Sequence, residues 1–284
     1  MGTLTFLAVL LSAFLHASWN VAGKKVAHIM AVPMFGFLFS GLFLTPFLIT
    51  NPIDWTHWKM ILFLVALSSI IHAIYIVSLF KAYEQWDVSI VYPVVRSTGI
   101  MICAITSIWF FKEQLSPIGL IGISLILAGI IFKGIVKTMQ THNPIDPKTI
   151  PSAVFVGTCV GAYLIVDRLA INLVNPIQFI SLLNVGIGIL LLPYFYITKP
   201  GMMTIALKHH KKYIVMIGFA AMGSYLIILW VFKQSSFGYI TSLRESSIVF
   251  ATAYGYWLLK ERITKVQLLS IVVMMIGAVL IKLG

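Results

Sequence analysis

Residues 96–113 read RSTGIMICAITSIWFFKE, and residues 244–261 read RESSIVFATAYGYWLLKE. The two stretches align without a gap at an offset of 244 − 96 = 148 residues. The offset pairs Arg96 with Arg244, Trp109 with Trp257, Lys112-Glu113 with Lys260-Glu261, and Gly129 with Gly277. From residue 96 to 130 it gives eight identities in 35 positions, where chance gives roughly three. The chain therefore contains an internal repeat with an arginine inside each apolar run.

Apolar runs of this kind fill the 284-residue chain, which is 60% hydrophobic and only 10% charged. A soluble domain carries about 25% charged residues. Each run reaches the roughly 20 residues that a helix needs to cross the hydrocarbon core of a bilayer. The sequence predicts an all-α membrane protein of about ten transmembrane helices, over residues 3–22, 30–50, 58–81, 88–111, 115–136, 151–170, 176–198, 211–234, 238–259 and 264–283.

The repeat divides the chain into residues 1–136, a linker loop at 137–150, and residues 151–284. Each half holds five predicted spans. Because five is odd, the second half must enter the membrane from the opposite side to the first. Two inverted five-helix repeats place a substrate site between the halves, near the midplane, and support alternating access. The pattern predicts a small-molecule transporter in contact with membrane lipid, and leaves open whether it is a monomer or a homodimer.

The net charge of +12 lies mostly in short loops, where lysine and arginine orient a membrane protein. Thirteen of these residues fall on one face and five on the other. The positive-inside rule then predicts that the basic face is cytoplasmic and that both termini lie outside, in a multi-pass protein of the cytoplasmic membrane. The charges form no aromatic-interleaved basic surface, so nucleic acid is not expected as a partner.

The sequence indicates neither a cofactor nor a metal site. Cys103 and Cys159 lie inside apolar spans and belong to no metal-spaced cluster. We find no nucleotide-binding, zinc-protease or nucleophile-elbow pattern, which disfavours an enzyme and a nucleotide-driven pump. The first apolar run lacks a basic start and carries His16 and Asn20, so we read it as a retained span.

Arg96 is the clearest candidate for a functional residue, because a charge in mid-span costs about 2.5–3.5 kcal/mol on insertion scales. It lies on one helical face with small and polar neighbours, namely Ser89, Tyr92, Gly99, Cys103 and Thr106. Such a face suits a cavity lining. The alternative is an arginine that joins two helices through their carbonyl groups.

Arg244 is the repeat partner of Arg96, and Glu245 follows it directly. Two arginines that approach the midplane from opposite halves suit a carboxylate or phosphate, which a guanidinium binds with two parallel hydrogen bonds. Glu245 could then take an amine or a coupling proton, which favours a zwitterion such as an amino acid. An Arg–Glu ion pair that closes a gate would leave the same sequence signature.

Other polar residues inside the spans are weaker candidates. His16 and Asn20 share a face of the first span with Trp19 beside them, and His72 and Tyr75 share a face of the third. Buried histidines in helix bundles often serve only as hydrogen-bond partners between helices. Tyr163 and Asp167 are spaced i, i+4 in the sixth span, but Asp167 is near a predicted helix end, which favours an interfacial position over a coupling or gating role.

The chain resembles EamA-type members of the drug/metabolite transporter superfamily over essentially its whole length. The residues that carry the resemblance are Leu15–Asn20, Lys81-Ala82-Tyr83, Val91–Ser97, Lys112-Glu113, Leu243–Ser247 and Lys260-Glu261. The resemblance implies ten helices in two inverted repeats, a central cavity lined mainly by the first, third, fourth, sixth, eighth and ninth spans, and transport of small metabolites, often outward. The chain departs from the family pattern in two ways. The proline of the fourth-span motif, Pro93, has Thr241 as its counterpart in the second half. Many relatives are also described with cytoplasmic termini, which conflicts with the lysine and arginine count.

Three functions follow as hypotheses. The first is a secondary transporter, acting as an exporter of a small polar or zwitterionic metabolite. Its predicted substrate-binding residues are Arg96, Arg244, Tyr92, His16, Trp19, Asn20, His72, Tyr75 and Tyr163, with Glu245 and Asp167 as candidates for coupling or gating. The second is a flippase for a lipid or lipid-linked precursor with an anionic headgroup. The third is a transporter of a quaternary amine or drug, held by the aromatic side chains.

Overall fold

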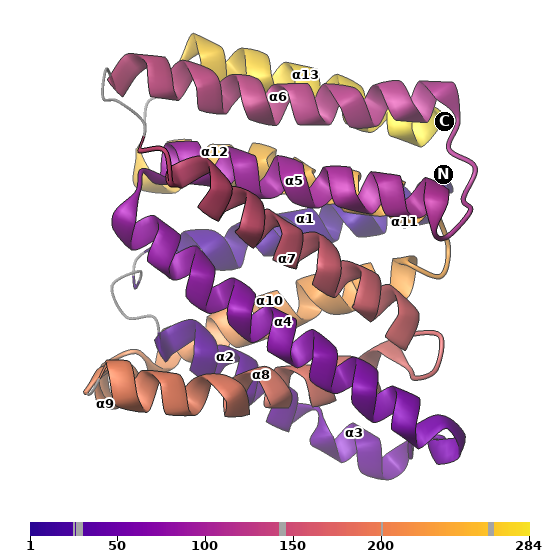
Figure 1. Cartoon of the computed structure of the whole chain (residues 1–284), viewed down its shortest axis with the longest axis vertical. Coiled ribbons are helices and arrows are strands. Elements are labelled where there is room, and N and C mark those ends of the chain that lie inside the picture. The colour runs from indigo at the N-terminus through magenta and orange to yellow at the C-terminus, as the bar shows by residue number, and fades with distance from the viewer. Residues whose placement is uncertain (25, 27–30, 142–145, 200, 261–263) are drawn as a thin grey trace.

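The computed structural model describes residues 1–24, 26, 31–141, 146–199, 201–260 and 264–284. Within them the chain is built of helices (Figure 1). In order these are α1 (Thr3–Lys24), α2 (Ala31–Phe43), α3 (Thr45–Thr50), η1 (Trp55–His57), α4 (Trp58–Gln85), α5 (Val88–Trp109), α6 (Pro117–Thr141), α7 (Thr149–Ala170), α8 (Pro176–Thr198), α9 (Met202–His209), α10 (Lys211–Val231), α11 (Phe237–Leu243), η2 (Arg244–Ser246), α12 (Ser247–Leu259) and α13 (Lys265–Leu283).

The helices confirm the predicted membrane architecture. Eight helical stretches of the described chain are long and apolar enough to cross a bilayer. The apolar part of α6, residues 117–132, and the interrupted run α11–η2–α12 bring the number of spans to ten. Large apolar side chains on the outer surfaces of α1 and α13, such as Leu7 and Val279, are more than half exposed. In a bilayer these side chains face lipid.

Two predicted spans are interrupted. The second divides at Leu44, because Pro46 has no N–H to bond the Leu42 carbonyl; the Thr45 hydroxyl donates to that carbonyl instead, at 2.7 Å. The ninth divides at the 3-10 turn η2. Here the Thr241 hydroxyl donates to the carbonyls of Phe237 and Gly238, a bonding pattern that often bends helices.

Two predicted loops are partly helical. The helix α6 continues to Thr141, so residues 137–141 of the predicted linker extend the fifth span; residues 142–145 lie outside the described chain. The turn expected after residue 198 leads into α9, and Gly201, the residue just before this helix, has a φ of 86°. This left-handed backbone is open to glycine at no steric cost. Both segments are too polar for the hydropathy pattern to mark them as spans.

The two halves are inverted with respect to each other. Gly122 of α6 is apposed to Gly277 of α13, whereas Gly129 is apposed to Ser270, so the last helices of the two halves run antiparallel. Likewise Gly41 of α2 lies against Val185 of α8, and Gly188 lies against Leu38. Equivalent helices that meet in opposite directions are what an inverted repeat requires.

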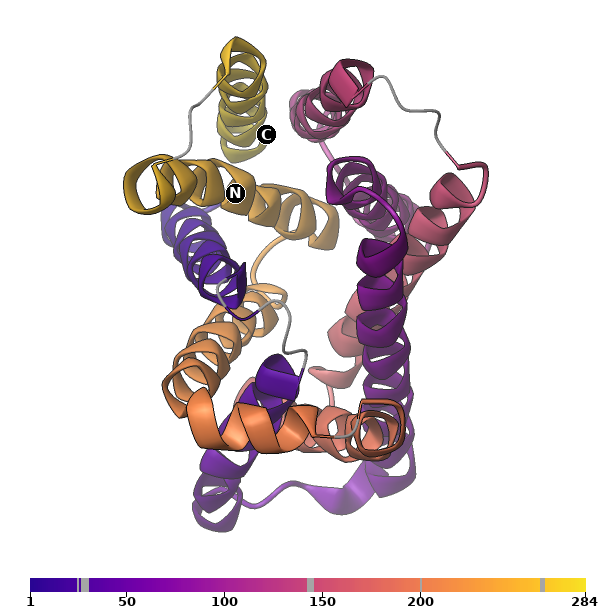
Figure 2. The same ribbon diagram turned by 90° about the vertical axis from the view of Figure 1, so that its left-hand side faces the viewer.

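The remaining contacts obey the same two-fold relation. The helix α1 packs on α10 and on α12, and their counterparts α7, α4 and α5 pack in the same way, α7 on α4 and on α5. Figure 2, turned by 90° from Figure 1, shows the helices arranged as a ring around a central axis. Side chains from α5, α7, α10 and α11–η2 together line a pocket.

The spans end at two faces. We call the face where the chain begins and ends the terminal face; there the Lys282 ammonium donates to the Met1 carbonyl at 3.0 Å. The opposite face, called the basic face, is where α1 ends and α2 begins. It receives the larger share of the loop lysines.

Candidate functional site

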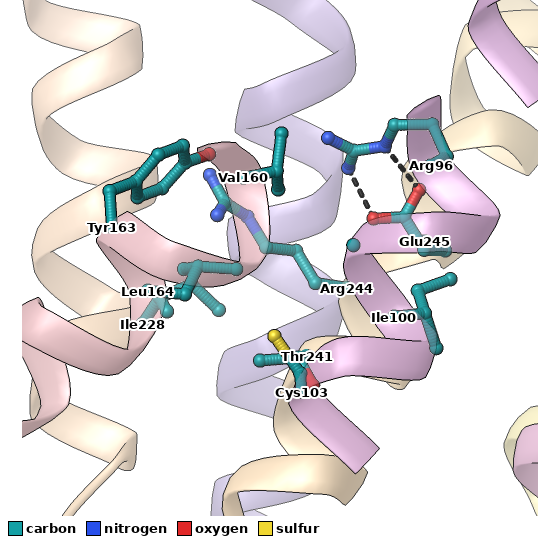
Figure 3. A pocket seen from close by; sticks show the side chains of 11 residues that line it. Arg96, Ile100, Cys103, Val160, Tyr163, Leu164, Ile228, Thr241, Arg244 and Glu245 are labelled. Atoms are coloured by element: carbon teal, nitrogen blue, oxygen red, sulfur yellow. Dashed lines mark hydrogen bonds and ion pairs between the residues drawn. The ribbon is translucent and has the colours of Figure 1, made fainter. Parts of the chain in front are cut away.

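A pocket lies between the two halves, at mid-depth in the spans (Figure 3). Its lining residues come from four spans and from η2: Arg96, Gly99, Ile100, Cys103, Val160, Tyr163, Leu164, Ile228, Thr241, Arg244 and Glu245. The polar face predicted for α5 supplies Arg96, Gly99 and Cys103, while the side chain of Ser89 lies outside the described part. In this conformation the pocket has room for about one water molecule. A metabolite would therefore need the helices to separate.

An ion pair between the halves forms one wall of the pocket. Arg96 of α5 binds Glu245 of η2 with two hydrogen bonds: Nε donates to Oε2 at 2.7 Å, and Nη2 donates to Oε1. Arg96 is 8% exposed and Glu245 is 4% exposed. The Tyr92 ring lies 5.9 Å from the guanidinium carbon. The positive charge of Arg96 is thus balanced in this conformation.

Arg244, the repeat partner of Arg96, has no such counterion among the residues that the structure describes. It is 8% exposed, and its Nε atom is buried without a hydrogen-bond partner. Its guanidinium carbon lies 5.2 Å from the Tyr225 ring, and its Nη2 atom lies 3.4 Å from His16 Nδ1. None of the ion pairs found among the described residues includes it. Figure 3 shows Arg244 and Glu245 pointing to opposite sides of the pocket.

His16 lies beside Arg244 and contacts Trp19, but neither His16 nor Trp19 is among the residues that line the pocket. The Trp19 indole donates to His16 Nδ1 at 3.2 Å, and the two rings meet edge to face. Since both Trp19 and Arg244 direct N–H groups at Nδ1, this atom acts as an acceptor. Asn20 does not join them, because it is exposed and donates to the His16 carbonyl of its own helix at 2.7 Å.

A second aromatic group lies on the same side of the pocket as the Arg244 guanidinium (Figure 3). Tyr163 lines the pocket, and its ring stacks on His72 with centroids 3.8 Å apart and approaches Tyr75 at 5.6 Å. His72 and Tyr75 therefore support Tyr163 from α4 rather than line the pocket themselves. Aromatic pairs of this kind hold a side chain in one orientation.

Asp167 lies near the end of its helix, as the sequence predicts, but its side chain is not at the protein surface. Asp167 is fully buried, three residues before the end of α7, because α4 packs on α7 and Tyr225 of α10 reaches the carboxyl group. The Ser68 hydroxyl donates to Oδ1, and the Tyr225 hydroxyl donates to Oδ2. Its neighbour Arg168 takes the peripheral position instead, with its side chain 18% exposed.

Sequence reasoning missed Tyr225 and the role of Glu113. Tyr225 contacts both Arg244 and Asp167, and its polar hydroxyl in the middle of the eighth span was the available signal. Glu113 accepts hydrogen bonds from Ser107 and from the Phe237 backbone N–H, and lies 4.0 Å from Arg168. Glu113 thereby ties both halves together at the terminal face.

Comparisons with known proteins agree with this architecture. The model of the EamA-like transporter family matches residues 3–134 and again residues 148–283. No curated protein matches the chain in sequence. One solved crystal structure superposes with a TM-score of 0.77 at 13% identity, over 100% of this chain and 98% of the other, which shows a shared fold. The double match spans nearly the whole sequence, and this chain belongs to the EamA-like transporter family.

Proposed function

We propose that this protein is a secondary transporter of the cytoplasmic membrane that exports a small zwitterionic metabolite, of amino-acid type, by alternating access. Its substrate carboxylate binds Arg244. The observation that carries this proposal is the unpartnered, buried Nε of Arg244 at the wall of the pocket. A buried charged donor without an acceptor is costly, and a ligand carboxylate would satisfy it.

The charge balance of the pocket favours an anionic group over a cation. Glu245 neutralises Arg96, so the three charged side chains that line the pocket leave one net positive charge, on Arg244. A quaternary amine would be repelled by this charge, although Tyr163 and Tyr225 offer aromatic surface nearby. An amine and a carboxylate on one substrate match Glu245 and Arg244 at the same time.

Opening of the pocket would use the contacts between halves. At the terminal face, Glu113 of the first half contacts Arg168 and the start of α11 in the second half. At the pocket itself, the Arg96–Glu245 pair joins α5 to η2. A substrate amine that competes for Glu245 would release Arg96. Binding would then be coupled to separation of the halves, as alternating access requires.

The proposal is tested by thermal shift of the purified protein in detergent. The ligands are the common amino acids, dicarboxylates, choline and glycerol phosphate. A ligand at about 100 times its Kd stabilises the folded state by about 2.7 kcal/mol. We expect a zwitterionic amino acid to stabilise the wild type. Loss of a hydrogen bond to a charged group costs about 1.5–3 kcal/mol, so Arg244→Gln should weaken the Kd by roughly 10- to 150-fold.

Lys233→Gln is the matched control, because it removes an exposed cation at the terminal face, away from the pocket and from the contacts between the halves. Its ligand response should equal that of the wild type. Stabilisation by choline alone would reject the carboxylate site, and stabilisation by glycerol phosphate alone would favour an anionic lipid headgroup. An unchanged response of Arg244→Gln would show that Arg244 does not bind the ligand.

A further inference from the structure

We infer that Asp167 is a proton-binding site that couples transport to a proton gradient, through Tyr225 and Arg244. This inference rests on the proposed function, because it assigns the driving ion of the same site. Asp167 lies behind the pocket and is not one of its lining residues. Its carboxyl group is shared among three spans, with α7 carrying it and α4 and α10 each supplying one hydroxyl donor.

The first ground is the isolation of the carboxyl group. Asp167 is 0% exposed, and no lysine, arginine or histidine nitrogen of the described residues is found within 4.0 Å of it. A carboxylate that is buried in a membrane protein without a cation is unfavourable in its charged form. Two hydroxyl donors stabilise that form, but they leave both protonation states accessible.

The second ground is that two other titratable side chains near the pocket, Glu245 and His16, are already committed to polar contacts. Both oxygens of Glu245 bind the guanidinium of Arg96. His16 Nδ1 accepts from Trp19 and faces Arg244, so a proton on this atom would break the first contact and oppose the second. The carboxyl group of Asp167 is neither bound to a guanidinium nor in direct contact with one among the described residues.

The groups that face Asp167 define its surroundings. From α4 they are Ser68 and, through Ser68, His72, whose Nδ1 lies 3.2 Å from the Ser68 hydroxyl. From α10 it is Tyr225. Arg244 of η2 lies on the far side of the Tyr225 ring, and Arg96 of α5 lies across the pocket, paired with Glu245. Tyr163 of α7 stacks on His72.

The contact between Tyr225 and Arg244 links protonation to the substrate site. A charged Asp167 accepts from both hydroxyls and holds the Tyr225 ring against Arg244. When a proton from the medium forms an O–H bond on Asp167, the carboxyl group becomes a donor and loses acceptor capacity. One of the two hydrogen bonds must then either reverse, with the carboxylic acid donating to the hydroxyl, or break, and we infer that the bond to Tyr225 is the one that changes. Movement of Tyr225 changes the surroundings of Arg244, and the proton leaves on the opposite side of the membrane after the halves exchange.

The proton site is tested first by infrared difference spectroscopy of the purified protein between neutral and acidic pH. On acidification we expect the carbonyl-stretching region to gain one band of a protonated, buried carboxylic acid, distinct from the bands of the exposed carboxyl groups, and we expect this band to be missing in Asp167→Asn. The matched control Asp54→Asn, in an exposed loop, should keep the band. Tyr225→Phe removes one donor to the carboxylate, so its band should be stronger than in the wild type at the same pH. Tyr256→Phe, at an exposed tyrosine, should not change it.

Coupling is tested in proteoliposomes with a mixture of radiolabelled amino acids. We measure accumulation driven by a pH gradient relative to exchange without a gradient. In Asp167→Asn the pH gradient should no longer drive accumulation, so uptake with the gradient should equal uptake without it. A band that persists in Asp167→Asn, or an unchanged ratio, would overturn the inference. If the wild type shows the Asp167 band but no amino-acid exchange, the proposed function fails whereas the proton site stands.

Discussion

Arg96 and Glu245 lie on opposite halves of the repeat, and two parallel hydrogen bonds join them inside the membrane. Removal of one partner from a buried ion pair costs about 3–5 kcal/mol, because the other charge is left uncompensated. Glu245→Gln should therefore lower the free energy of unfolding by this amount, as measured by denaturant unfolding in detergent. The double variant Arg96→Gln with Glu245→Gln should recover much of the loss. A loss in the double variant equal to the sum of the losses in Arg96→Gln and Glu245→Gln would show that the two side chains are not coupled.

The contact between α6 and α13 leaves no space for side chains at Gly122 and Gly277. A Cβ atom on Gly277 would lie 2.6 Å from the Gly122 carbonyl oxygen. Overpacking a close contact costs about 1–3 kcal/mol, so Gly277→Leu should destabilise the protein by at least this much in thermal unfolding. Gly23→Ala is the control, since a Cβ there meets nothing within 4 Å, and its effect should stay within about 0.5 kcal/mol. A stable Gly277→Leu protein would contradict this packing.

Lys112 and Lys260 occupy equivalent positions of the repeat and both have left-handed backbone, with φ of 55° and 54°. This conformation costs an L-residue other than glycine about 1–2 kcal/mol. Lys112→Gly and Lys260→Gly should each stabilise the protein by up to about 1 kcal/mol, after the entropy cost of glycine. Thermal unfolding checks this. The β-branched variant Lys112→Val should be destabilised, and a more stable valine variant would contradict the assignment.

The lysine and arginine distribution predicts that the terminal face is outside the cell. Single cysteines can be placed on the exposed residues Asp54, at the terminal face, and Lys208, at the basic face, after Cys103 and Cys159 are replaced by alanine. An impermeant maleimide added to intact cells should label Asp54→Cys and spare Lys208→Cys. The reverse labelling would place both termini in the cytoplasm.

The spans and the repeat could be predicted because bilayer thickness fixes helix length, and because a charge inside an apolar run stands out. Arg96 and Arg244 were found in this way, and both line the pocket. The interruption at η2 was not predicted, because Thr241 bends the helix through hydrogen bonds that are equally available to an unbent one.

The partners of individual side chains also depend on tertiary packing. The sequence placed Asp167 near a helix end, but only the packing of α4 and the contact from Tyr225 of α10 show that the carboxyl group is covered. Tyr225 lacks a polar residue at an equivalent position of the first half, where Val77 lies at the 148-residue offset. The repeat therefore gave no reason to single it out.

The helix α5 is continuous through Pro93, whereas its counterpart is interrupted at η2. In an inverted repeat, exchanging the conformations of the two halves generates the opposite state of the transporter. Such an exchange would straighten α11–η2–α12 and move the irregular turn to residues 96–98 of α5. Pro93 already lacks the N–H that would resist this bend. The present structure thus has its bend in the second half. If the bend moves to α5 during turnover, the distance between spin labels at residues 92 and 100 should shorten.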